Sequence, residues 1–227
     1  MLPSIDRARP ENVDPVRACK RKHIDRLRTF LFQPTVGYGS GVLAMEEKIV
    51  AAGFGGQGIM LMGKLLAYAG IIEERCVTCL PSYGPEMRGG TANCTVILSS
   101  KRIGSPYVTE PSSLIVMNQP SLDRFENAVI PNGVVLLNSS MINREVGRKD
   151  IRAVKVAASN IAEGLGNIRA ANMVALGAFV GVKPVVRIDS LLIALEKVLP
   201  KRHKDLLTMN TEALQRGLQA FTSGPKG

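Results

Sequence analysis

Six residues, Gly-Phe-Gly-Gly-Gln-Gly at positions 53–58, have types and a spacing that could cradle a phosphate group. The pattern G-x-G-x-x-G makes a tight turn, lets a ligand or a neighbouring backbone approach, and lets the following helix pack closely on the preceding strand. Backbone N–H groups at the start of that helix could then hold an anion. The candidate positions in this turn are Gly53, Gly55, Gly56, Gln57 and Gly58.

The glycine pattern by itself does not decide between a ligand and simple packing. A dinucleotide-binding fold requires an acidic residue about 20 positions further on, which binds the ribose. Residues 77–80 occupy that place and read Val-Thr-Cys-Leu, while Glu73 and Glu74 come too early, before the next expected strand. NAD binding is therefore disfavoured. Contact with a partner protein, binding of another phosphate, and glycines that serve only the chain turn remain open.

A second segment has side chains that could bind a ligand or transfer a proton. It reads P-S-Y-G-P-E-M-R-G-G-T-A-N-C at positions 81–94. It places polar and charged side chains among turn-forming residues directly before an apolar strand, and such loops often carry function. The planar guanidinium of Arg88 could bind a carboxylate or a phosphate, and Glu86 could orient it or accept a proton. The alternative is that these two side chains only pair with each other or with surface neighbours. Tyr83 and Asn93 complete the candidates of this segment.

The cysteines and histidines favour no metal site. Cys76 and Cys79 form a C-x-x-C inside an expected strand, where residues three apart face opposite sides, so we interpret them as a buried structural pair. We expect Cys94 in the core. The sequence lacks the C-x2-C-x2-C-x3-C run of a ferredoxin-type cluster, and the histidines, His23 and His203, have no ligand-like neighbours. We therefore predict neither a catalytic nor a metal-binding residue.

Expected strands and helices alternate from Met45 onward. The strands are expected at 48–53, 75–80, 91–98, 113–117, 134–137 and 152–156. The helices are expected at 57–69, 122–128, 167–180, 190–199 (with Asp189 as its N-cap) and 201–221. This order predicts an α/β fold: a three-layer Rossmann-like domain with a largely parallel or mixed sheet and a helical C-terminal third.

The first 44 residues differ in composition from the rest of the chain. They contain four prolines, a basic run at 17–23 and the sequence G-Y-G-S-G at 37–41. Residues 1–44 are expected to be an N-terminal extension, either a disordered tail, a basic arm for an anionic partner, or residues upstream of a true start at Met45, which we favour. The domain would then span 45–222, followed by a tail at 223–227.

Composition and charge exclude several classes of protein. The chain is 45% apolar and 21% charged, which is typical of a globular domain rather than a disordered one. Its uncharged runs, such as residues 49–63 and 170–182, all stay below the roughly 18 residues needed to span a membrane, and no apolar leader core is visible, so we expect a cytoplasmic protein. Aromatic residues make up only 4%, which disfavours nucleic-acid modules that stack bases. The net charge of +10 suits an anionic ligand, an acidic partner surface or simple solubility.

Four motifs in order resemble one protein family. They are the turn at 53–58, the segment at 81–94, M-N-Q-P-S-L-D-R-F at 117–125, and L-G-N-I-R-A-A-N-M-V-A-L-G-A at 165–178. Together they resemble the gamma subunit of 2-oxoacid:ferredoxin oxidoreductases, which also occurs as an internal domain of single-chain pyruvate:ferredoxin oxidoreductases. The resemblance covers about residues 45–221.

The resemblance implies a role in a larger complex. Such complexes convert a 2-oxoacid, coenzyme A and oxidised ferredoxin into acyl-CoA, carbon dioxide and reduced ferredoxin. The alpha, beta and ferredoxin-like delta subunits would hold thiamine diphosphate, Mg²⁺ and [4Fe–4S] clusters, while this chain alone would bind no cofactor and be inactive. The candidates at 53–58 and 81–94 would contact partner subunits or coenzyme A, whose phosphates suit Arg88.

The substrate and the function class are further expectations. The four motifs, with E-M-R-G-G at 86–90, are most similar to those of 2-oxoglutarate or branched-chain 2-oxoacid enzymes. We favour 2-oxoglutarate, with branched-chain 2-oxoacids or pyruvate as alternatives. A free-standing nucleotide-binding protein is the second class. It is disfavoured because the acidic residue that would bind the ribose is missing. An assembly scaffold without a ligand is the third, which the segment at 81–94 disfavours, because packing alone seldom needs Tyr, Glu and Arg among so many glycines and prolines.

Overall fold

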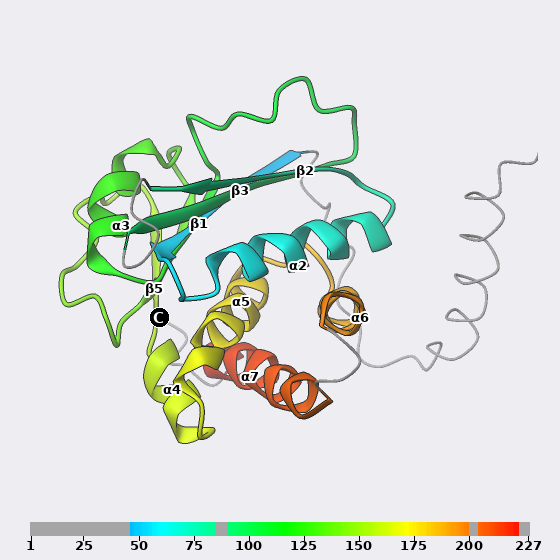
Figure 1. The fold of residues 1–227 in the computed structure, drawn as a ribbon. Coiled ribbons are helices and arrows are strands. Elements are labelled where there is room, and N and C mark those ends of the chain that lie inside the picture. Colours follow the sequence, from blue (N-terminus) through cyan, green and yellow to red (C-terminus); the bar gives the residue numbers. More distant parts are fainter. Residues whose placement is uncertain (1–45, 85–89, 200–203, 223–227) are drawn as a thin grey trace, which may run out of the picture. The chain divides into compact units, whose positions relative to one another are not determined.

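Strand β1 (Glu46–Phe54) lies inside a six-stranded sheet in the computed structural model, which describes residues 46–84, 90–199 and 204–222 (Figure 1). Its residues Ile49–Ala52 are almost wholly buried, because helices or loops cover both faces of the sheet. It pairs antiparallel with β3 (Thr91–Ser99) and parallel with β4 (Ser113–Val116). The expectations for residues 1–44 and 223–227 lie outside the described residues.

The strand order is β2-β3-β1-β4-β5-β6, with β2 at Cys76–Tyr83, β5 at Val134–Asn138 and β6 at Arg152–Val156. Within this sheet only β3 runs against the others, so the sheet is mixed. The chain leaves β1 toward β2 and β3 on one side and later returns to β4 on the other. In open α/β sheets, such a reversal of strand order creates a crevice beyond the strand ends, where ligands usually bind.

Helices form layers on the sheet (Figure 1). Helix α2 (Ile59–Ile72) and helix α5 (Ala171–Val182) cover one face, with α6 (Ile188–Val198) against α2 and α7 (Lys204–Thr222) against α5. The other face is covered by α3 (Gln119–Phe125), the 3-10 turn η1 (Glu126–Ala128) and neighbouring loops. Helix α4 (Ala158–Gly164) and the turn η2 (Ile168–Ala170) lead from β6 into α5. The α/β class and the helical C-terminal third are confirmed.

Two apolar clusters hold these layers together. The larger joins the α2 and α5 face of the sheet to the C-terminal helices, and the smaller joins the opposite face to Leu122 and its neighbours around α3. Helices α5 and α7 approach closely because glycines remove side chains at their crossing. A Cβ at Gly177 would lie 2.0 Å from the Leu214 carbonyl oxygen, and one at Gly217 would lie 2.0 Å from the Val174 carbonyl oxygen.

Three local expectations were wrong. Residues 81–83, expected in a loop, continue β2, because they pair in register with residues 92–94 of β3. Asp189 is not an N-cap: α6 begins at Ile188 after Arg187, whose N–H donates to the Glu73 carboxylate at 2.7 Å. Helix α4 was not expected: it begins after Ala157 without a side-chain cap, whereas α3, also of seven residues, is capped by Asn118. No helix of the described ranges combines the length and apolarity needed to cross a membrane.

Candidate functional site

The glycine-rich turn joins β1 to α2 and is closed by its own glutamine. The Gln57 side-chain oxygen accepts from the Phe54 N–H at 2.7 Å, and the Gln57 N–H donates to the Phe54 carbonyl oxygen at 3.2 Å. Gly56 and Gly58 have φ angles of 95° and 74°, a region that favours glycine. The turn is therefore a locally bonded structure whose backbone donors are partly used to hold its own shape.

Two of the turn glycines are required by close packing. A Cβ at Gly53 would lie 2.6 Å from the Gln57 side-chain oxygen and 2.7 Å from the Ile59 side chain. A Cβ at Gly58 would lie 2.1 Å from the side-chain nitrogen of Asn172. A Cβ at Gly56, by contrast, would meet nothing within 4 Å. Packing within this chain thus accounts for the first and last glycines of the motif, and it leaves the middle of the turn open to a partner or ligand.

The turn and the second candidate segment meet at the same end of the sheet. The Gly55 N–H donates to the Gly90 carbonyl oxygen at 3.0 Å, and Phe54 is paired with Thr91. The Gly84 N–H donates to the Thr91 carbonyl oxygen at 2.8 Å. The tertiary structure therefore brings together two motifs that residues 59–80 separate in the chain.

The individual candidates of the second segment are placed differently. The Tyr83 side chain is 68% exposed at the end of edge strand β2, on the sheet face that α2 covers further along. Asn93 pairs with Ala52 and Ser82, so it lies on the opposite face and is half-buried. Glu86 and Arg88 lie outside the described residues, and their roles remain predictions. The described candidates share one end of the sheet without converging on one point.

Two buried asparagines, Asn118 and Asn172, form hydrogen bonds with the glycine-rich turn. Neither was among the predicted site residues. Asn118 follows β4, caps α3 by accepting from the Ser121 N–H at 2.9 Å, and donates to the Gln57 side-chain oxygen at 3.4 Å. Asn172 is 3% exposed at the start of α5 and donates to the Gly58 carbonyl oxygen at 3.3 Å.

Both asparagines had a sequence signal: Asn118 precedes Gln-Pro, which suits a helix cap, and Asn172 is a single amide in an otherwise apolar helix. They belong to the motifs at 117–125 and 165–178. Contacts at the glycine-rich turn therefore connect all four motifs.

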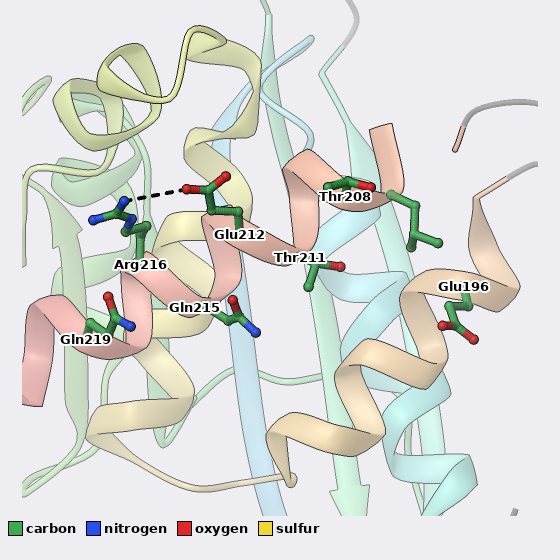
Figure 2. A pocket seen from close by; sticks show the side chains of 8 residues that line it. Glu196, Thr208, Thr211, Glu212, Gln215, Arg216 and Gln219 are labelled. Carbon is green, nitrogen blue, oxygen red and sulfur yellow. Dashed lines mark ion pairs between the residues drawn. The ribbon is translucent and has the colours of Figure 1, made fainter. Parts of the chain in front are cut away.

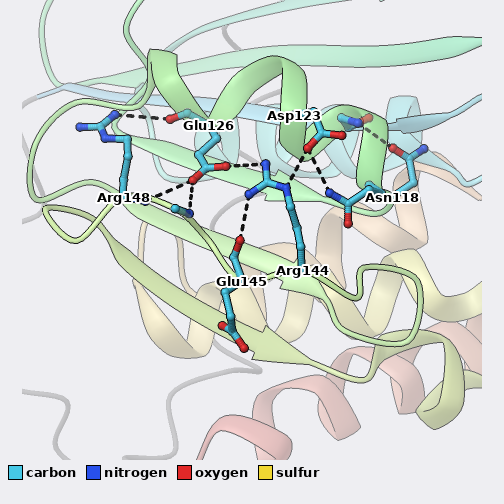
Figure 3. Close-up of polar contacts among 9 residues, drawn as sticks. Asn118, Asp123, Glu126, Arg144, Glu145 and Arg148 are labelled. Carbon is cyan, nitrogen blue, oxygen red and sulfur yellow. Dashed lines mark hydrogen bonds and ion pairs between the residues drawn. The ribbon is translucent and has the colours of Figure 1, made fainter.

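An ion-pair network supports α3 on its outer side (Figure 3). The Arg144 guanidinium contacts Asp123 at 2.8 Å and Glu126 at 2.6 Å, and Glu126 is only 5% exposed. The hydrogen bond from Arg144, with a weaker contribution from Gln119, lowers the pKa of Asp123. Arg148 also donates to backbone carbonyls of η1 and Val129. The network attaches the loop after β5 to α3, the helix that Asn118 caps, and we interpret it as structural support.

An open groove of about 720 Å³ lies between α6 and α7 (Figure 2). Its walls are mainly polar, and Arg216 already pairs with Glu212 one helical turn away at 3.5 Å. None of the candidate residues from the sequence lines the groove, whose lining residues are Glu196, Leu207, Thr208, Thr211, Glu212, Gln215, Arg216 and Gln219. We therefore place the candidate functional site at the glycine-rich turn and not in this groove.

The cysteine interpretation needs a correction. Cys76 and Cys79 do face opposite sides of β2, since they pair with Ser99 and Val96, but both are exposed rather than buried. Cys79 has its sulfur 3.5 Å from that of buried Cys94. In the part of the chain that the structure describes, no group of three or more His, Cys, Asp or Glu side chains could hold a metal ion.

Comparisons with curated proteins find relatives in methanogenic archaea. The chain is 44% identical over 137 residues to ketoisovalerate oxidoreductase subunit VorA of Methanothermobacter thermautotrophicus, which covers 60% of this chain and 28% of VorA. It is 31% identical over 171 residues to 2-oxoglutarate synthase subunit KorC of Methanocaldococcus jannaschii, covering 73% of this chain and 91% of KorC. The chain thus spans less than a third of VorA but nearly the whole of KorC.

Solved structures share the fold. The gamma subunit of a keto/oxoacid ferredoxin oxidoreductase from Geobacter sulfurreducens is 27% identical with a TM-score of 0.68, over 78% of this chain and 99% of that one. The 2-oxoglutarate:ferredoxin oxidoreductase of Magnetococcus marinus is 22% identical with a TM-score of 0.73, over 81% of this chain and 32% of that one, and shows the fold alone. Residues 48–220 match the family model of pyruvate ferredoxin/flavodoxin oxidoreductase. The chain therefore belongs to the pyruvate ferredoxin/flavodoxin oxidoreductase family, and its described domain is of the gamma-subunit type.

Proposed function

We propose that the chain is the gamma subunit of a multi-subunit 2-oxoacid:ferredoxin oxidoreductase that acts in the cytoplasm. The complex would convert a 2-oxoacid, coenzyme A and two oxidised ferredoxins into acyl-CoA, carbon dioxide and two reduced ferredoxins. Alpha, beta and ferredoxin-like delta subunits would carry thiamine diphosphate, Mg²⁺ and the iron–sulfur clusters. The observation that carries this proposal is the contact of all four family motifs around one glycine-rich turn.

The chain's own part in the reaction would be to shape and close the active site that its partners build. Gly55 and Gly56 are exposed, and Tyr83 presents an aromatic ring to the outside at the same end of the sheet. An exposed aromatic beside a rigid turn is typical of a protein–protein contact. We infer that this end of the sheet faces a partner subunit, with Asn93 contributing from the opposite face.

Coenzyme A is the second candidate for contact at this end of the sheet. The turn holds the N–H groups of Phe54, Gly55 and Gln57 in bonds within the chain, which leaves fewer donors for a phosphate. The exposed backbone around Gly56 and the cation of Arg88 would remain for the cofactor. We rank it after the subunit contact.

For the oxoacid we propose the branched-chain class first and 2-oxoglutarate second. The four sequence motifs fit both 2-oxoglutarate and branched-chain enzymes, while the relative at 44% identity is named for ketoisovalerate and the one at 31% for 2-oxoglutarate. Most of the oxoacid pocket would belong to other chains, so this ranking rests on the relatives and not on residues of the described domain.

The test is reconstitution with the partner subunits. The chain would be purified alone and with co-expressed alpha, beta and delta subunits, and each sample assayed for viologen reduction with coenzyme A and 2-ketoisovalerate, 2-oxoglutarate or pyruvate. We expect the chain to co-purify with its partners, turnover only in the complex, and the highest activity with 2-ketoisovalerate. Turnover by the chain alone, a stoichiometric iron–sulfur spectrum of the chain, or no assembly with the partners would overturn the proposal.

A further inference from the structure

Two cysteine sulfurs lie in contact on neighbouring strands. Cys79 of β2 pairs with Val96 and Cys94 of β3 pairs with Pro81, so the two cysteines are diagonal neighbours on the sheet face covered by α2. Their sulfur atoms are 3.5 Å apart. The proposed function uses neither thiol, and the two residues lie 15 positions apart in the chain.

The two thiols differ in accessibility. Cys79 is exposed on edge strand β2, whereas Cys94 is 1% exposed. Helix α2 packs against Cys94 at Gly63, where a Cβ would lie 2.2 Å from the Cys94 sulfur. Because the helix blocks that side, a reagent from solvent reaches Cys79 first, while the Cys94 sulfur stays held beside it.

The contact also gives the two thiols different pKa values. The hydrogen bond between the two sulfurs stabilises the Cys79 thiolate and lowers the pKa of Cys79 to about 7. The same bond, together with burial, raises the pKa of Cys94. A thiolate is the nucleophile in disulfide chemistry, so the exposed cysteine is also the activated one.

We propose that Cys79 and Cys94 form a thiol–disulfide exchange site, with Cys79 as the attacking cysteine and Cys94 as the resolving cysteine. The oxidant is a low-molecular-weight disulfide, RSSR. The Cys79 thiolate attacks one sulfur of RSSR, forms a mixed disulfide and releases RS⁻. Cys94 then loses its proton to solvent, and its sulfur attacks the Cys79 sulfur, releasing the second RS⁻. Two electrons pass from the protein dithiol to RSSR, which ends as two thiols after protonation.

Closing the bond requires the sulfurs to move from 3.5 Å to about 2.0 Å. Strand β2 can make this movement because it is an edge strand with a partner on one side only within the described sheet, whereas β3 is held between β2 and β1. The disulfide would tie β2 to β3 close to the end where Tyr83 and the glycine-rich turn lie. It is therefore a modification site beside the proposed subunit contact.

The experiment treats the reduced full-length chain with oxidised 2-mercaptoethanol and maps peptides without reduction. We expect a Cys79–Cys94 link, seen as a linked peptide pair whose mass is two hydrogen atoms below the sum of the two reduced peptides. Exposed Cys76, three residues away on the other face, is the internal control. At pH 7 we expect iodoacetamide to alkylate Cys79 about threefold faster than an ordinary exposed cysteine, because its larger thiolate fraction outweighs its lower intrinsic nucleophilicity.

Single substitutions separate the two roles. Cys94→Ser should stop at the mixed disulfide on Cys79, and Cys79→Ser should leave Cys94 unmodified. A lasting 2-hydroxyethylthio adduct on Cys79 in the unsubstituted chain would refute the resolving role of Cys94. A Cys76–Cys79 link, or modification of Cys76 ahead of Cys79, would refute the site. These mass measurements need only the chain itself. They therefore test the exchange site independently of the oxidoreductase assay that tests the proposed function.

Discussion

The side-chain amide of Asn172 donates to the backbone carbonyl of Gly58 at 3.3 Å, across 114 residues of sequence. The contact fastens the start of α5 to the start of α2, directly beneath the turn that joins β1 to α2. It leaves no room for a side chain at position 58, where a Cβ would lie 2.1 Å from the amide nitrogen. The last glycine of the motif is therefore needed both for its backbone angle and for this neighbour.

Gly58→Ala should destabilise the domain more than Gly56→Ala. Both positions have positive φ, so both substitutions carry a left-handed strain of about 1–2 kcal/mol. Only position 58 adds a clash, which costs about 1–3 kcal/mol more. Urea unfolding of the two variants measures the difference. Equal losses of unfolding free energy would show that the asparagine contact does not constrain position 58.

Asn172→Ala should lower the unfolding free energy by about 0.5–1.5 kcal/mol through the lost hydrogen bond, plus a contribution from the small cavity. It should also relieve the clash at position 58. The double variant with Gly58→Ala is therefore expected to lose less than the sum of the single variants, by about 0.5–3 kcal/mol. Additive losses in this double-mutant cycle would contradict the direct contact.

The buried carboxylate of Glu47 depends on Lys183. Glu47 is 2% exposed and accepts from Ser112, Ser113 and the Lys183 ammonium, which joins β1 and β4 to the residue after α5. Lys183→Met should lower the unfolding free energy by about 1.5–3 kcal/mol, because a buried charge loses its cation.

Lys48→Met is the matched control for this prediction. The pair of Lys48 with Glu46, at 3.3 Å, has both side chains about 40% exposed and should contribute less than about 1 kcal/mol. Thermal unfolding of both variants tests the contrast. The prediction is contradicted if the two midpoints fall by the same amount.

Arg88 should contribute an anion contact in the assembled complex. Arg88→Lys keeps the charge but loses the planar guanidinium, so it should already impair function. Arg88→Ala should impair function further, by about 10- to 150-fold, because the lost contact contributes about 1.5–3 kcal/mol. A raised KM for coenzyme A would indicate the cofactor, and a lower yield of complex in gel filtration would indicate a partner carboxylate.

Arg216→Ala, an exposed arginine of α7 with a side chain 55% exposed, is the control for the Arg88 series. It should leave both the KM and the yield of complex unchanged. Normal kinetics and normal assembly of Arg88→Ala would show that this arginine only interacts with solvent.

A chain that begins at Met45 should unfold at the same temperature as the full chain and assemble equally well. The family match begins at residue 48, and β1 begins at Glu46. Calorimetry and co-purification with the partner subunits measure the two properties. A marked loss of either would show that residues 1–44 belong to the folded and functional unit.

The sequence by itself determined the elements and the family. Strands and helices could be predicted because apolar periodicity is a local property of consecutive residues, as the match of the expected strand at 152–156 with β6 shows. The glycine-rich turn was predictable for the same reason, since its glycines follow one another in the chain. Helix α4 was not predictable in this way, because it is short and lacks the capping side chain that marks the equally short α3.

Only the tertiary structure decided which residues meet. Strand β3 inserts between β2 and β1, and this insertion brings Gly90 to Gly55 and places Cys94, rather than Cys76, beside Cys79. Strand partners depend on long-range packing, so local patterns cannot identify them. The hydrogen bond of Asn172 could not be predicted from local patterns either, because its partner, the Gly58 carbonyl, belongs to a distant segment of the chain. The motifs can thus be identified from the sequence, whereas their contact at the glycine-rich turn depends on how the buried surfaces of distant segments fit together.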